Sequence, residues 1–130
     1  MGVRQDVLLR ITPGVEAHTH EYIRTGQIDS KFGFTLPNGQ AARAVEKVIT
    51  YPELNFIGLH CHIGSQIFEM TSYRHAVEVM MSFIREIRDK FGAEVSELDL
   101  GGGFGIYYTS EDTPAEITQY AASVLDTLKE

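Results

Sequence analysis

The sequence is poor in cysteine, in positive charge and in long apolar runs. Its one cysteine, Cys61, excludes an internal disulfide and favours a reducing compartment. Eleven Lys and Arg face 18 Asp and Glu, giving a net charge of −7 and a pI near 5.2. Nucleic acids and anionic membranes require a basic surface, so neither is expected as a partner. No apolar run approaches the roughly 18 residues of a membrane span, and the first residues lack the apolar core of a signal peptide. We therefore expect a cytoplasmic protein that binds a small molecule.

The order of apolar patterns predicts the fold class. At 130 residues the chain has the length of about one domain. Strand-like runs alternate with helix-like stripes, in the order strand 7–11, helix 38–49, strand 56–63, helix 72–91, strand 95–100 and helix 117–128. Such alternation predicts an α/β fold with parallel strands and right-handed crossovers. The polar segment 16–31 is expected to be a long functional loop.

Each predicted strand has one apolar face and one polar face, since side chains alternate along a strand. The residues on the polar faces are Arg10, His60, His62 and Asp99. Cys61 falls on the apolar face, so we expect a buried small hydrophobe and not a nucleophile. A barrel interior with polar residues near its mouth has this pattern. The chain therefore predicts three consecutive βα units of a TIM (β/α)8 barrel, which is an incomplete barrel.

A run of three glycines, Gly101 to Gly103, ends the third predicted strand. Glycine lacks a Cβ, so the run is best explained where main-chain N–H groups converge on an anion, with φ above zero at its centre, Gly102. A capping box at residues 113–116 predicts that a helix starts soon afterwards. A loop between strand and helix is the usual site for phosphate. The alternative is that the glycines form a tight turn with no ligand. The run does not match the G-x-G-x-x-G motif of dinucleotide-binding proteins or the Walker motif of nucleotide-binding proteins.

Two histidines, His60 and His62, share one strand face. This spacing occurs in barrel metal hydrolases and recurs at residues 18–20, but only Asp99 offers a carboxylate on the expected face, so we predict no metal. A strand histidine can instead lie flat against a planar cofactor ring, with Ser65 just beyond the strand supplying a hydroxyl to an anion. A third interpretation is a hydrogen-bonded polar network in the core.

Four runs carry a family resemblance. Residues 58–66 read Gly-Leu-His-Cys-His-Ile-Gly-Ser-Gln and residues 98–105 read Leu-Asp-Leu-Gly-Gly-Gly-Phe-Gly, while the runs 18–26 and 29–33 agree in order and spacing. Together they resemble the fold-type III pyridoxal-phosphate-dependent decarboxylases, whose barrel is of the alanine racemase-like type. The resemblance covers nearly the whole chain.

The resemblance implies a cofactor, a chemistry and roles for individual residues. It places His62 against the ring of pyridoxal 5'-phosphate, with His60 deeper on the same face, and Ser65 with Gly101 to Gly103 at the phosphate. It also places Arg10 near the cofactor. The implied reaction removes the carboxylate from the D-centre of meso-diaminopimelate to give lysine, with the ring as electron sink. The alternatives are decarboxylation of ornithine, arginine or carboxynorspermidine, a non-catalytic pyridoxal-phosphate-binding protein, or a metal-dependent hydrolase.

Parts of the family pattern are missing. The Schiff-base lysine, the Glu-Pro-Gly-Arg segment and the Cys segment supplied by a partner subunit have no match here, and none of Lys31, Lys47, Lys90 or Lys129 stands in the lysine motif. Residues 1–130 are thus expected to form a partial pyridoxal-phosphate-binding barrel domain, without the N-terminal strands and C-terminal β domain. It would hold no catalytic residue and would be inactive alone. The resemblance further implies a homodimer with a shared active site.

Overall fold

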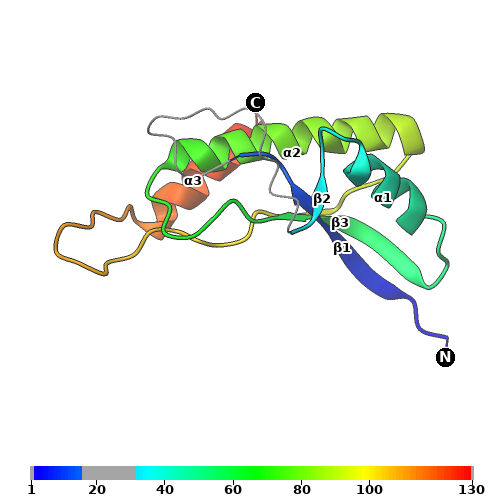
Figure 1. Ribbon diagram of the computed structural model, residues 1–130, viewed down its shortest axis with the longest axis horizontal. Helices are drawn as coiled ribbons and strands as arrows, with labels where there is room; N and C mark the ends of the chain where they lie inside the picture. The colour runs from blue at the N-terminus through cyan, green and yellow to red at the C-terminus, as the bar shows by residue number, and fades with distance from the viewer. Residues whose placement is uncertain (1, 16–31, 130) are drawn as a thin grey trace.

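The protein is described by a computed structural model over residues 2–15 and 32–129. Figure 1 shows a layer of helices against one side of a small sheet. The predicted loop 16–31, with His18, His20 and Lys31, lies outside the described residues. The α/β class expected from the sequence is confirmed, because every strand pair in the described part of the chain is parallel.

Seven elements follow one another along the described chain. They are β1 (Gln5–Thr12), β2 (Phe34–Thr35), α1 (Gln40–Val48), β3 (Leu54–Cys61), α2 (Met70–Phe91), β4 (Glu97–Asp99) and α3 (Ile117–Lys129). The strands lie in the order β2-β1-β3-β4. In a parallel sheet the carboxyl ends of all strands meet at one edge, so the loops after β3 and β4 are brought to the same place.

Strand β2 was not predicted from the sequence. It is two residues long and pairs with Ile11 and Thr12 at the end of β1. Two residues are too few to show an alternation of apolar and polar side chains, so β2 can be recognised only from its pairing with β1. Its presence puts β1 inside the sheet, whereas β2 and β4 form the two edges.

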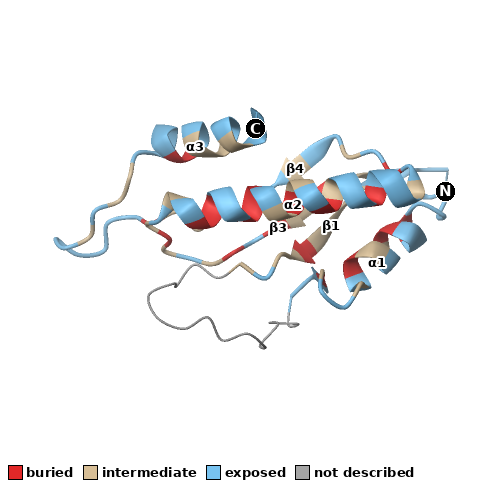
Figure 2. Cartoon of the chain, turned by 90° about the horizontal axis from the view of Figure 1, so that it is seen from above, coloured by how far each residue is buried: buried red, intermediate tan, exposed pale blue. Residues whose placement is uncertain are grey.

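The core lies between the sheet and helices α1 and α2, whose buried residues line up along one side in Figure 2. Ile11, Leu59 and Cys61 enter it from the strands, which confirms the predicted apolar faces. The alternation fails earlier in β3, because the pairing with β1 skips Ile57 and so turns Phe56 towards the core. This one-residue irregularity reverses the side-chain parity that the sequence predicted for the start of the strand.

Cys61 is the buried hydrophobe that its position predicted. Its burial raises the pKa of the thiol to about 11, and the negative charge of Asp99 acts in the same direction. The thiol therefore stays protonated at neutral pH, which excludes a role as a ready nucleophile.

Of the three helix ends predicted from the sequence, the end of α2 is confirmed. Helix α2 ends at Gly92, which takes the left-handed conformation with φ of 64°. The N-cap of α1 is Gly39 and not the expected Asn38, although Asn38 Oδ1 accepts the N–H of Gln40 at 3.0 Å. The capping box predicted at residues 113–116 is wrong, since α3 begins only at Ile117. The side chain that satisfies an N–H group there is Gln119, whose Oε1 accepts the N–H of Glu116 at 2.9 Å.

Across the described residues, no helix combines the length and apolarity that a membrane crossing requires.

Candidate functional site

Two loops lie side by side where β3 and β4 end. The N–H of Ile67 donates to the carbonyl of Gly103 at 2.9 Å, and the N–H of Gly105 donates to the carbonyl of Ile67 at 2.8 Å. Ile67 and Phe104 thereby form a parallel bridge that continues the sheet beyond its strands. Ser65 and the glycine run, which are far apart in the sequence, are brought together by this pairing.

The glycines at the two ends of the run are needed for close approach between the loops. Gly101 has φ of 72°, and a Cβ there would lie 2.8 Å from the carbonyl oxygen of Cys61 and from His62 Nδ1. Gly103 has φ of 93°, and a Cβ there would lie 1.9 Å from the carbonyl oxygen of Gly64. Any other residue at these two positions would push the loops apart.

The central glycine behaves differently. Gly102 does not have positive φ, so that expectation is wrong, and apart from its two chain neighbours no described residue has an atom within 4 Å of the place a Cβ would take. Within the described part of the chain, the N–H groups of Gly102 and Gly103 donate no hydrogen bond. The run therefore has main-chain donors and open space together at its centre, which is what an anion requires.

A polar row crosses the face of the sheet opposite the helices. Arg10 on β1 is the register partner of His60 on β3, and His60 is the partner of Asp99 on β4. Asp99 Oδ1 accepts the N–H of Gly101 at 2.7 Å. Its Oδ2 lies 3.1 Å from His60 Nδ1, a buried nitrogen for which the described residues provide no aligned hydrogen bond. Asp99 thus links the polar row to the glycine run.

The two histidines differ in depth as the sequence predicts. The side chain of His60 is 26% exposed. His62 is the first residue beyond β3, is exposed, and lies with its ring beside Gly101. A planar ligand held by the glycine run would therefore meet His62 first. The described residues contain no group of three His, Cys, Asp or Glu that could hold a metal ion.

An aromatic cluster supports the glycine run from the helix side. Tyr73, Phe104 and Tyr120 have ring centroids 4.7 to 5.7 Å apart. The hydroxyl of Tyr73 donates to the carbonyl of Gly102 at 3.1 Å, and that of Tyr120 donates to the carbonyl of Ile67 at 2.9 Å. Burial raises the pKa of Tyr73 to about 12, so the phenol remains a donor at neutral pH.

Sequence reasoning missed Tyr73. Its position could have indicated a role, because Tyr73 stands three residues before Ala76 and so falls on the apolar stripe of α2. A phenol on a buried stripe needs a partner for its hydroxyl. The glycine loop provides it.

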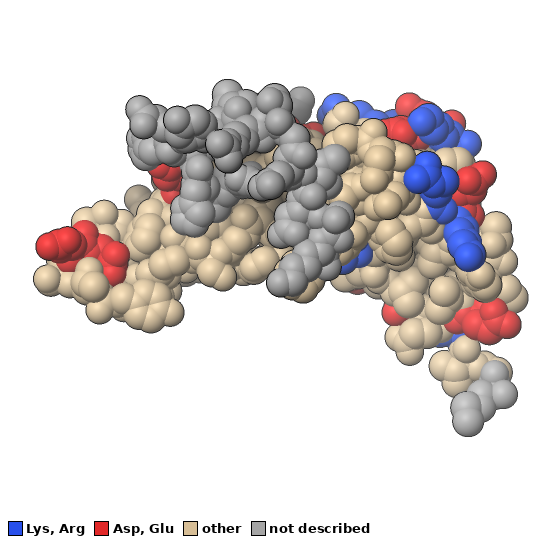
Figure 3. Space-filling model, viewed as in Figure 1, with Lys and Arg blue, Asp and Glu red and all other residues tan. Residues whose placement is uncertain are grey.

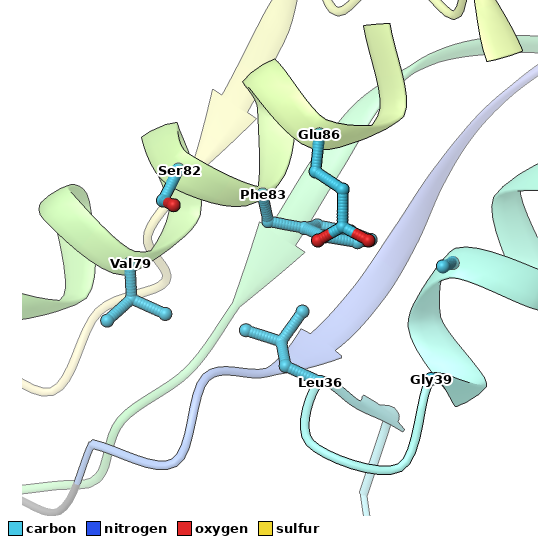
Figure 4. A pocket seen from close by; sticks show the side chains of 7 residues that line it. Leu36, Gly39, Val79, Ser82, Phe83 and Glu86 are labelled. Atoms are coloured by element: carbon cyan, nitrogen blue, oxygen red, sulfur yellow. The ribbon is translucent and has the colours of Figure 1, made fainter. Parts of the chain in front are cut away.

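The described cavities lie away from these loops. A groove of about 220 Å³ between α1 and α2 is shown in Figure 4, and a second of about 430 Å³ lies along β2 and α1. Neither is lined by a residue of the glycine run, by His62 or by Ser65. We place the candidate site on the loops, because donors and open space coincide there and not in the grooves.

Comparison with known proteins places this arrangement among relatives. The family described as pyridoxal-dependent decarboxylase, pyridoxal binding domain, matches residues 2–130. The diaminopimelate decarboxylase of Bacillus subtilis is 52% identical over 125 residues, which is 96% of this chain and 28% of that protein. The diaminopimelate decarboxylase of Mycobacterium tuberculosis is 43% identical over 127 residues, 95% of this chain and 28% of that protein. This chain thus spans less than a third of the length of these relatives.

A solved structure agrees with the sequence relatives. The diaminopimelate decarboxylase of M. jannaschii in complex with L-lysine superposes with a TM-score of 0.84 at 31% identity, over 98% of this chain and 29% of that one. The two loops described above therefore occur within a fold that similar proteins share.

Proposed function

This chain belongs to the family of pyridoxal-dependent decarboxylases, and we propose that it forms the part of a diaminopimelate decarboxylase that holds the phosphate and ring of pyridoxal phosphate. The observation that carries the proposal is the pair of loops after β3 and β4. They bring Ser65 and His62 to a glycine run with unused main-chain donors. Bound there, the cofactor supplies an electron sink for the decarboxylation.

The residues present fit a phosphate and a planar ring. The N–H groups of Gly102 and Gly103 and the hydroxyl of Ser65 would donate to phosphate oxygens. His62 would lie against the ring, and Arg10, across the sheet from His60, would add positive charge near the cofactor. The open space at Gly102 leaves room for the ligand.

The substrate is proposed from the relatives. Similar proteins named diaminopimelate decarboxylase reach 52% identity, whereas a lysine/ornithine decarboxylase from Vibrio vulnificus is 24% identical and supports the fold alone. The M. jannaschii structure was solved with L-lysine, the molecule that remains when diaminopimelate loses one carboxylate. We therefore favour meso-diaminopimelate over ornithine or arginine.

The cofactor-linking lysine is proposed to lie outside residues 1–130. The described lysines Lys47, Lys90 and Lys129 belong to α1, α2 and α3, and the helices cover the face of the sheet opposite the polar row. Figure 3 shows basic side chains gathered over α1 and the adjoining end of α2. This supports the expectation that residues 1–130 are one part of a barrel domain without chemistry of their own. We also propose a cytoplasmic location and a homodimeric enzyme.

The test uses the protein in its full natural length. Gly102→Val should fold, since its Cβ would have no described neighbour within 4 Å and the backbone there does not need positive φ, but its two methyl groups should exclude the phosphate. We expect wild type and Gly102→Ala to bind pyridoxal phosphate and to release carbon dioxide from meso-diaminopimelate, and Gly102→Val to do neither. Unimpaired cofactor binding by Gly102→Val would place the phosphate elsewhere. Release from ornithine in preference to meso-diaminopimelate would replace the proposed substrate.

A further inference from the structure

Gln66 joins the two loops through its side-chain amide. Its Nε2 donates to the carbonyl of Ile106 at 2.7 Å, and its Oε1 accepts the N–H of Ile106 at 3.1 Å. We propose that Gln66 is a positioning residue that clamps the exit of the glycine loop against the β3 loop and so holds the phosphate donors in place. This inference rests on the function proposed above.

The chemistry of the contact is specific to a primary amide. One side chain must donate to a carbonyl and accept from an N–H of the same residue, Ile106, and among ordinary side chains an amide presents both groups side by side. Glutamate could accept from the N–H but would direct a negative oxygen at the carbonyl. Asparagine carries the same amide on a stem one methylene shorter, so it cannot span the same gap from an unchanged backbone.

The backbone of Gln66 is strained. Its φ of 58° makes it the one residue other than glycine with positive φ among those the structure describes. Such a conformation costs free energy in residues with a Cβ, and strained residues persist where surrounding contacts hold them. The two hydrogen bonds to Ile106 stabilise Gln66 in this conformation.

Ile106 and the two residues after it are exposed. Ile106 is 55% exposed, and Tyr107 and Tyr108 are 71% and 75% exposed. Burial and the bonds of Ile67 anchor the chain as far as Gly105, and burial no longer anchors it from Ile106 onwards. Asp99 holds the entrance of the run through the N–H of Gly101, and the amide of Gln66 provides the matching hold at the exit.

The consequence is selective for the phosphate. If the clamp is released, the glycine loop is still held by the bonds of Ile67 and Tyr73, but the N–H groups of Gly102 and Gly103 are held less firmly at their separation from Ser65, whereas the ring contact with His62 is unchanged. Loss of Gln66 should thus weaken binding of pyridoxal phosphate more than binding of pyridoxal, which lacks the phosphate.

The experiment compares Gln66→Gly, Gln66→Glu and wild type in the full natural chain, with titrations of both ligands followed by absorbance. Gln66→Gly removes the clamp and also the backbone strain, so its thermal unfolding should change little. We expect a roughly tenfold loss of affinity for pyridoxal phosphate in both variants, the factor that corresponds to about one net hydrogen bond, and unchanged affinity for pyridoxal. The matched control is Asp112→Ala, which removes hydrogen bonds to Tyr108 and Thr109 in the adjoining loop and should leave both affinities unaltered.

The outcomes separate the two proposals. If wild type binds pyridoxal phosphate no better than pyridoxal, the phosphate site itself is wrong. If wild type prefers the phosphate and both Gln66 variants keep that preference, the clamp is refuted and the site stands. An equal loss of affinity for both ligands would also refute the clamp, because it would indicate general damage.

Discussion

Replacing Gly103 with alanine should damage the fold and not only the site. The added Cβ would lie 1.9 Å from the carbonyl oxygen of Gly64, a distance at which backbone must move, and it would do so at φ of 93°. Gly102→Ala is the matched control, since among the described residues only its chain neighbours would lie within 4 Å of its Cβ. The two variants add the same methyl group to neighbouring residues of one loop.

The magnitude follows from the contacts that the movement would break. Positive φ in alanine costs roughly 1–2 kcal/mol. Separation of the loops would weaken the two hydrogen bonds of Ile67, to Gly103 and from Gly105, each contributing about 1 kcal/mol net. We expect a total near 3 kcal/mol, which corresponds to a fall of about 10 °C in the unfolding midpoint if roughly 130 residues unfold as one unit.

Circular dichroism during heating measures the difference. Gly103→Ala should unfold well below wild type, and Gly102→Ala should match wild type or exceed it slightly, because alanine restricts the unfolded chain. If the two variants melt within about 2 °C of one another, the loops are not in the close contact on which this reasoning depends.

Two further predictions concern residues behind the glycine run. Asp99→Ala should weaken pyridoxal phosphate binding by roughly tenfold because the N–H of Gly101 loses its acceptor, and Asp99→Asn should recover part of the loss; equal affinities in the two variants, measured by titration, would contradict this. The raised pKa of Cys61 means that its contribution to stability is complete below pH 9 and is lost as the pH rises towards 11. Denaturant unfolding across that window should show a shallower loss of stability in Cys61→Ala than in wild type, and an equally steep loss would show that another group titrates there.

The sequence predicted the α/β class and the order of the main elements, whereas the roles assigned to the site residues stay predictions. The glycine run, Ser65 and the two histidines stand in short motifs whose residue types indicate a chemistry, so they could be selected as candidates without knowledge of the fold. The expected depth order, with His60 less exposed than His62, holds, and the irregularity at Ile57 that breaks the alternation comes before both residues. Earlier in β3 the same alternation gave the wrong face for Phe56. Whether a residue of β3 is skipped in the pairing depends on the neighbouring strand β1, so the residue pattern of β3 alone could not predict it.

What the sequence could not predict depends on contacts between distant segments. Gln66 and Ile106 are separated by 40 residues, and nothing in either loop indicates that they meet. The conformation of Gly102 was wrongly predicted for the same reason, since three identical residues give no hint that only the outer two approach other backbone. The carbonyl groups of Cys61 and Gly64 leave no room for a Cβ at Gly101 and Gly103 respectively, and no such contact restricts Gly102.

The alternation along β3 has a consequence for how this protein could be redesigned. Leu59 and Cys61 are fully buried in the core, whereas His60 and His62, interleaved with them, lie on the side of the sheet that carries the polar row. A library randomised at the two histidines would change ligand preference with little change in the unfolding temperature. A library randomised at Leu59 and Cys61 would change the unfolding temperature with little change in ligand preference. The four residues from Leu59 to His62 thus offer two nearly independent sets of positions to directed evolution.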